Sequence, residues 1–262
     1  MPRFSANLGF LWPELPLEEA IRAAASAGFD AVECHWPYDR DPALVRAALE
    51  ETGLAMLGLN TTTGGEGRFG LLALTDEEKA ARASIDQAVA YAAAIGAAGI
   101  HAMAGIAQGP EAEATFRRNL RYACDEAAEH GITILIEPIN PRDMPGFLLN
   151  RQDEAHAIVQ ELGEPGLQVQ MDLYHCQIVE GDLAMKLRQY LPTGRVGHLQ
   201  IAGVPERHEP DVGELNYAYL FDVIDAVSAD CGWQGWVGCE YRPARGAVAG
   251  GTSAGLGWRR RA

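Results

Sequence analysis

Four polar residues lie at the ends of four separate apolar runs, where a packed strand has no use for them. The runs are ITILIEP, LQVQMD, VGHLQ and GWVGCE, and the residues are Glu137, Asp172, Gln200 and Glu240. Burying an unpartnered carboxylate costs several kcal/mol, so each needs a cation, a donor or water. Four such ends converging on one point would form an oxygen-rich pocket suited to a hard divalent cation such as Mg²⁺ or Mn²⁺. The pattern therefore predicts a metal site.

Each of these residues also has a structural alternative when it is taken alone. An acid at a strand end can cap the following helix or pair with an arginine, and structural ion pairs are common. Three carboxylates at one point, however, would repel one another strongly unless a cation neutralised them. Four polar ends in register on successive strands therefore favour one shared site.

Two histidines lie close to these strand ends in the sequence. His175 follows Asp172 by three residues in MDLYH, so it could face a substrate from the loop after the strand. His198 precedes Gln200 by two residues, which places both on one face of their strand. His198 could therefore lie below Gln200 or replace it as a ligand.

Four further histidines divide into two pairs. His35 and His101 end two other apolar runs and could line the same pocket, although a single histidine there is as often a hydrogen-bonded core residue. His130 and His156 fall within helical patterns, and we expect both on the surface.

The elements that must position these residues follow one rhythm. Short apolar runs alternate with longer helical patterns about eight times, and SAGF, ETGL, AAGI, EHGI and CGWQG place Gly between a helix and a strand. Strands separated by helices pair in parallel, and eight such units close a (β/α)₈ TIM barrel. The long segments NTTTGGEGRFGLLALTDEE and IAGVPERHEPDVGELN both follow strands, on the face where barrels carry active sites. No linker interrupts the pattern, so we expect one α/β domain over residues 1–262.

Composition excludes several classes of partner. The net charge of −15 argues against a nucleic acid or an anionic membrane, because phosphates are bound by clustered Lys and Arg. The five cysteines are odd in number and have no CxxC spacing, which indicates reduced thiols and a cytoplasmic protein. Trp233, Trp236 and Trp258 could cover an interface of a homo-oligomer, but packing between helix and barrel is the preferred interpretation.

Seven segments carry a resemblance to a known family. They are FSANLGFLW, AGFDAVECHWPYD, IEPIN, MDLYHCQI, GHLQIAGVPERHEPDVGELNY, GCEYRP and AGLGW. In matching order over nearly the whole chain, they resemble the hydroxypyruvate isomerase family. That family is similar to the wider group of xylose-isomerase-like barrels, which includes sugar epimerases and metal-dependent endonucleases that act on abasic DNA.

The resemblance implies a division of labour among the four strand-end residues. All four would hold the divalent metal, and Glu137 and Glu240 would also serve as the proton donor and acceptor pair. It further implies that His175 and Arg207 bind the substrate.

One position departs from the related ketose epimerases. They use a histidine where this chain has Gln200, and Arg207 lies one residue farther from that position than in them. The departure favours the hydroxypyruvate isomerase branch and leaves His198 as a competitor for the ligand role.

The predicted reaction interconverts hydroxypyruvate and tartronate semialdehyde (2-hydroxy-3-oxopropanoate). A proton leaves the hydroxyl-bearing carbon, an enediolate forms, and a proton returns to the adjacent carbon. A metal bridging the two oxygens would stabilise the enediolate charge. A four-carbon substrate such as 2-oxo-tetronate, or a ketose that is epimerised at C3, remains an alternative. An endonuclease or a non-catalytic sugar-acid-binding barrel is less favoured.

Overall fold

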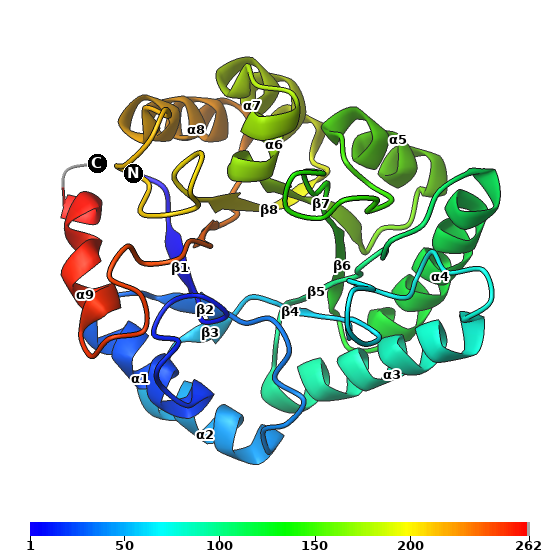
Figure 1. Ribbon diagram of the computed structural model, residues 1–262, viewed down its shortest axis with the longest axis horizontal. Coiled ribbons are helices and arrows are strands. Elements are labelled where there is room, and N and C mark those ends of the chain that lie inside the picture. The colour runs from blue at the N-terminus through cyan, green and yellow to red at the C-terminus, as the bar shows by residue number, and fades with distance from the viewer. Residues whose placement is uncertain (261–262) are drawn as a thin grey trace.

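A ring of parallel strands surrounded by helices forms the protein, and the computed structural model describes residues 1–260 (Figure 1). The strands are β1 (Phe4–Asn7), β2 (Ala31–Glu33), β3 (Ala55–Met56), β4 (Leu59–Asn60), β5 (Gly99–His101), β6 (Thr133–Ile136), β7 (Leu167–Asp172), β8 (Val196–Ile201) and β9 (Val237–Cys239). The α-helices are α1 (Leu17–Ser26), α2 (Pro42–Thr52), α3 (Glu78–Ile95), α4 (Pro110–Ala128), α5 (Gln152–Leu162), α6 (Leu173–Val179), α7 (Leu183–Tyr190), α8 (Tyr217–Cys231) and α9 (Gly251–Gly255). Two 3₁₀ turns, η1 (Leu191–Thr193) and η2 (Leu256–Arg260), complete the elements.

Nine strand segments occupy eight barrel positions, because the third strand is interrupted. β3 pairs with β2 and β4 pairs with β5, so the two short segments lie in line as one position that closes the barrel. Backbone hydrogen bonds from Leu57 to Val32 and from Cys34 to Gly58 continue the pairing across the break. The predicted single-domain TIM barrel is confirmed. The run LAMLGLN predicts one uninterrupted strand, whereas the structure divides it into β3 and β4.

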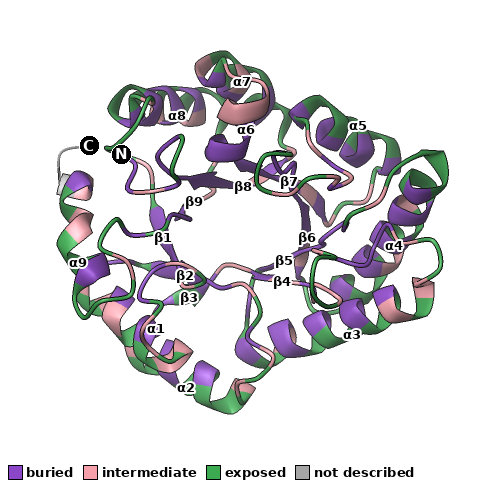
Figure 2. Ribbon diagram, viewed as in Figure 1, coloured by how far each residue is buried: buried purple, intermediate pink, exposed green. Residues whose placement is uncertain are grey.

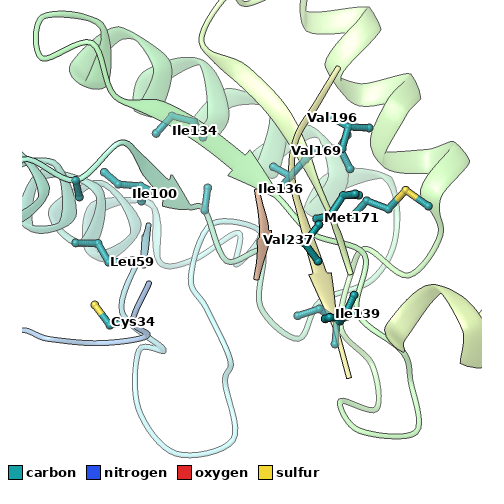
Figure 3. Packing of buried hydrophobic residues seen from close by; sticks show 14 of the residues in the cluster. Cys34, Leu59, Ile100, Ile134, Ile136, Ile139, Val169, Met171, Val196 and Val237 are labelled. Atoms are coloured by element: carbon teal, nitrogen blue, oxygen red, sulfur yellow. The ribbon is translucent and has the colours of Figure 1, made fainter. Parts of the chain in front are cut away.

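Side chains alternate between the barrel interior and the helical layer. Ile134, Ile136 and Val169 belong to the apolar core, and Figure 3 shows them between sheet and helices. Leu135 and Gln170, which follow in alternation, line the interior instead. Figure 2 shows the consequence, since buried residues occupy the strands and the inner faces of the surrounding helices.

The helix signals are largely reproduced. Asp41 caps α2 through a 2.9 Å bond from the backbone N–H of Ala43, with Pro42 in the first turn. The segment AAGI predicts a glycine between helix and strand, but that glycine, Gly99, is already the first residue of β5. Gly96 ends α3 instead, in a left-handed conformation (φ 73°) that glycine adopts without steric cost.

Two of the three C-terminal tryptophans contact strands of the barrel, in line with the preferred interpretation. Trp258 is buried against Phe4 with ring centroids 5.3 Å apart, and the Trp233 indole donates to the carbonyl of Val196. All five cysteines are free, and Cys231 is the exposed one. None of the helices within residues 1–260 is long and apolar enough to cross a bilayer.

His156 is buried, contrary to the prediction of a surface position. Only 4% of it is exposed, and its ring stacks on Tyr190 with centroids 3.9 Å apart. Ala155, Ile158 and Val159 share the buried face of α5, and the helical period of these apolar residues could have placed His156 there. Burial, with smaller contributions from nearby cations, lowers the pKa of His156 from 6.5 to about 4.

Acid should therefore destabilise the protein through His156. The unfolded chain takes up this proton near pH 6.5 and the folded chain only near pH 4, so stability is lost as pH falls between these values. Between pH 7.5 and pH 5, wild type should lose about 2 kcal/mol more than the His156→Phe variant, measured by urea unfolding. The exposed His130→Phe variant should lose as much as wild type. Equal losses in wild type and His156→Phe would contradict the prediction.

Candidate active site

The four predicted strand-end residues lie on four adjacent strands at one end of the barrel. Glu137 directly follows β6, Asp172 ends β7, Gln200 lies in β8 and Glu240 directly follows β9. Asp172 and Gln200 are register partners, so they stand at one level. All four are buried.

Glu137 has one occupied and one unpartnered carboxylate oxygen. Oε2 accepts a 2.8 Å bond from the amide of Gln170 and lies 3.3 Å from Nδ1 of His101. Oε1 has no hydrogen-bond partner among residues 1–260, although it is buried. Burial, followed by repulsion from Glu240 and Asp172, holds the pKa of Glu137 well above its ordinary range.

Asp172 caps a helix with one carboxylate oxygen and faces other site residues with the second. Oδ1 caps α6 by accepting from the backbone N–H of Tyr174 at 2.7 Å, while Oδ2 lies 3.5 Å from His175 and 3.4 Å from Arg207. Burial is the main cause that raises the pKa of Asp172 to about 7, and Arg207 opposes it.

His175 is oriented by Asn140, which the sequence did not single out. Asn140 Oδ1 accepts from the backbone N–H of Asp143, so its Nδ2 donates to Nδ1 of His175 at 2.6 Å. With Nδ1 accepting, the neutral ring carries its proton on Nε2, which lies 3.6 Å from Oε1 of Glu137. Burial and the neighbouring Arg207 keep the pKa of His175 well below 6.5, so the ring is neutral.

Arg207 contacts the acids themselves. Its Nη2 donates to Oε2 of Glu240 at 2.6 Å and to Asp172 at 3.4 Å. Its guanidinium is buried between the rings of Phe10 and Tyr174, at 5.0 and 4.9 Å from their centroids. Its backbone is in a left-handed conformation (φ 58°), and the residue lines the pocket.

Glu240 contacts two basic side chains. Besides Arg207, His35 Nε2 lies 2.9 Å from its Oε1. Burial alone would raise the pKa of Glu240, but Arg207 and His35 outweigh it and lower that pKa below its ordinary range. His35 thus lines the pocket, which is one of the two positions that the sequence allows for it, the other being the core.

Gln200 and His198 both turn toward Glu33 inside the barrel. Gln200 Nε2 donates to Oε1 of Glu33 at 2.8 Å, and His198 Nε2 lies 2.5 Å from Oε2. His198 thus faces the interior network, whereas the carbonyl Oε1 of Gln200 is buried without a partner. Burial would raise the pKa of Glu33, yet His198 and Gln200 lower it overall.

A known protein family matches most of the chain in sequence. The sequence model of the xylose isomerase-like TIM barrel matches residues 21–262. The chain belongs to the xylose isomerase-like TIM barrel family.

Relatives of this barrel family match the chain along its length. A 2-oxo-tetronate isomerase from Cupriavidus necator is 50% identical over 98% of this chain and 97% of its own. The hydroxypyruvate isomerase of Escherichia coli K12 is 37% identical over 98% of each chain. A crystal structure from Brucella melitensis described as AP endonuclease, family 2, is 43% identical with a TM-score of 0.92, covering 100% of this chain and 99% of that one. With curated isomerases related over the full length, the protein is an isomerase.

The donor set of this xylose isomerase-like barrel fits a divalent cation. Ligand atoms of Glu137, Asp172 and His175 lie within 4.8 Å of one another. Because the Nε2 of His175 carries a proton, we assign it as a donor beside the acids. The unpartnered oxygens of Glu137 and Gln200 are the hard ligands that Mg²⁺ and Mn²⁺ prefer. Three acids beside one arginine also leave an excess of negative charge.

The pocket above the acids contains residues that no local sequence pattern marks. Phe10, Trp36, Phe69 and Arg242 line it together with Tyr174. The Arg242 guanidinium lies 5.3 Å from the centroid of Phe10. Among residues 1–260, the ion pairs of the site engage Arg207 and not Arg242.

Proposed function

We propose that this isomerase interconverts a short 2-oxo acid and its hydroxy-carbonyl isomer by proton transfer between adjacent carbons. One observation carries the proposal. Two buried carboxylates, Glu137 and Glu240, line a single pocket, and Asp172 and Gln200 are buried register partners on the two strands between them. Burying so many acids has no packing benefit, and it suits a reaction that needs both a cation and a pair of proton carriers.

The proposed metal ligands are Glu137, Asp172, Gln200 and Glu240. A divalent cation held there would supply Lewis-acid stabilisation of the negative charge that develops on the substrate oxygens. His175 Nε2–H and Arg207 would donate to those oxygens, since both already point at the acids around which the substrate must fit.

Glu137 and Glu240 are proposed to move the protons. One carboxylate takes a proton from the hydroxyl-bearing C3, and the pair returns a proton to C2. The hydroxyl proton on C3 passes to the oxygen on C2, so the carbonyl group changes place without any net oxidation. No redox cofactor takes part in this balance.

Two substrates of this class are candidates for the chain. The names of the relatives fit hydroxypyruvate, the substrate that the family resemblance favours, and the alternative 2-oxo-tetronate. The 50% identity to the 2-oxo-tetronate isomerase, against 37% to the hydroxypyruvate isomerase, favours the four-carbon acid. Both substrates present a carboxylate, a 2-oxo group and a C3 hydroxyl to the same residues.

Turnover measurements test this proposal. Protein stripped with a chelator and reloaded with Mn²⁺ or Mg²⁺ should isomerise both acids, with the higher kcat/KM on 2-oxo-tetronate, and the stripped protein should not. No turnover of either acid by the reloaded protein would refute it. Nicking of abasic DNA or epimerisation of a neutral ketose would support the rival functions.

Arg242 supports an acidic substrate over a neutral ketose. Its guanidinium lines the pocket and lies near Phe10, which leaves its donors available to a carboxylate. Arg242→Gln should raise KM for the 2-oxo acids by about 10–100-fold with little change in kcat, because a lost charge-assisted hydrogen bond costs roughly 1.5–3 kcal/mol. Arg242→Lys should recover part of the affinity. An unchanged KM in Arg242→Gln would contradict this assignment, and the exposed Arg46→Gln serves as the control.

A further inference from the structure

A second polar centre, around Glu33, lies inside the barrel. Glu33 ends β2, is buried, and faces across the barrel to β8. Barrel interiors are usually filled by branched apolar side chains, so a carboxylate at this position requires an explanation.

Four donors converge on the Glu33 carboxylate. Ser5 and Asn7 of β1 donate at 3.2 and 3.0 Å. His198 and Gln200 of β8 complete the set at 2.5 and 2.8 Å. Both oxygens of Glu33 are therefore engaged, and the side chain is held from two strands that are not sequence neighbours.

The contact with Glu33 decides which end of the Gln200 amide faces away from it. The oxygen and nitrogen of a glutamine amide have nearly the same shape, so only hydrogen bonding distinguishes the two orientations. A carboxylate accepts and does not donate, so Nε2 of Gln200 must face Glu33. The carbonyl Oε1 then faces away, buried and without a partner, at the level of Asp172.

The neighbouring strand leaves space for this contact. A Cβ at Gly238 of β9 would lie 2.5 Å from Oε1 of Glu33 and 2.8 Å from Nε2 of His198. Any larger residue there would collide with both groups. Glycine at position 238 thus preserves the approach of Glu33 to β8.

We infer that Glu33 is a positioning residue that orients the amide of Gln200 so that its oxygen, and not its NH₂ group, is offered to the divalent cation. The inference rests on the proposed function, which makes Gln200 a ligand. It adds a determinant of metal affinity that lies outside the ligand set.

Mn²⁺ titration of three variants tests the inference. In Glu33→Leu no acceptor holds Nε2 of Gln200, so the Gln200 amide is free to turn and to offer NH₂ to the cation. Mn²⁺ binding should weaken about 10–100-fold, the usual effect of losing such a supporting contact. The double variant E33L/Q200E should bind within a few-fold of wild type, because a carboxylate at position 200 offers oxygen whichever way it is turned. Ser5→Ala removes a donor to Glu33 without touching Gln200 and should bind as wild type does.

The possible results separate this inference from the proposed function. Wild-type affinity in Glu33→Leu, or a loss that the double variant does not recover, overturns the inference. Wild-type affinity in Gln200→Ala would instead overturn the proposed ligand set. If Glu33→Leu does not fold, a crystal structure of the Mn²⁺-loaded wild type decides. The inference requires Oε1 of Gln200 on the cation and Nε2 on Glu33, and it fails if that contact with Glu33 is broken.

Discussion

Glu240→Gln should lower kcat for the 2-oxo acids by about 10²–10⁴-fold, the usual contribution of a positioned acid or base. Glutamine keeps the shape of the side chain and an oxygen that can bind a cation, but it cannot take up a proton. Glu137→Gln should lose a similar factor, since the proposed reaction uses both carboxylates. Rates are measured at saturating Mn²⁺, so that weakened metal binding does not imitate a loss of proton transfer.

A buried carboxylate outside the pocket provides the matched control. Glu209 accepts from the backbone N–H of Ala244, and Glu209→Gln should retain kcat within a few-fold. A second readout is the exchange of the substrate C–H for deuterium in D₂O, which should stop in whichever of Glu240→Gln and Glu137→Gln lacks the base. Activity in Glu240→Gln within threefold of wild type would remove this residue from the proton path. Tight substrate binding by a wild type that turns over neither acid would favour a sugar-acid-binding barrel.

The positions of the strand-end residues were predictable because the signal is local. A run such as ITILI that stops at Glu137 marks both a buried strand and its C-terminal end. The alternation of strands and helices then places all such ends at one face of the barrel. The metal-ligand roles of these residues remain a prediction.

The supporting residues were not predictable, because they depend on which strands meet across the barrel. Glu33 lies 167 positions from Gln200, and Asn140 lies 35 positions from His175. The acid within the apolar run AVECHW was a visible signal, but its partners required the closed barrel. The substrate-binding role of Arg207 remains a prediction, and its contacts with Glu240 and Asp172 depend on the folding of the loop after β8.

Arg207→Met should destabilise the metal-free protein by about 3–5 kcal/mol, because removing one partner of a buried ion pair leaves the other charges uncompensated. Glu240 and Asp172 would then face each other inside the protein with no cation between them. The expected change in melting temperature is a decrease of roughly 6–20 °C. Mn²⁺ should reverse much of it, since a cation replaces the missing positive charge and should bind the variant more tightly than wild type.

Arg142→Met is the control for Arg207→Met, because it also removes an arginine near the pocket but one that is exposed. Arg142 pairs with Asp143 while about half of its side chain is exposed, so Arg142→Met should cost about 1 kcal/mol or less. Melting curves for both variants with chelator and with Mn²⁺ give the comparison. Equal stability of Arg207→Met and wild type without metal would mean that the acids are not ionised together. Equal Mn²⁺ stabilisation of both proteins would mean that Arg207 and the cation do not neutralise the same carboxylates, and the proposed metal position would then have to move away from Asp172 and Glu240.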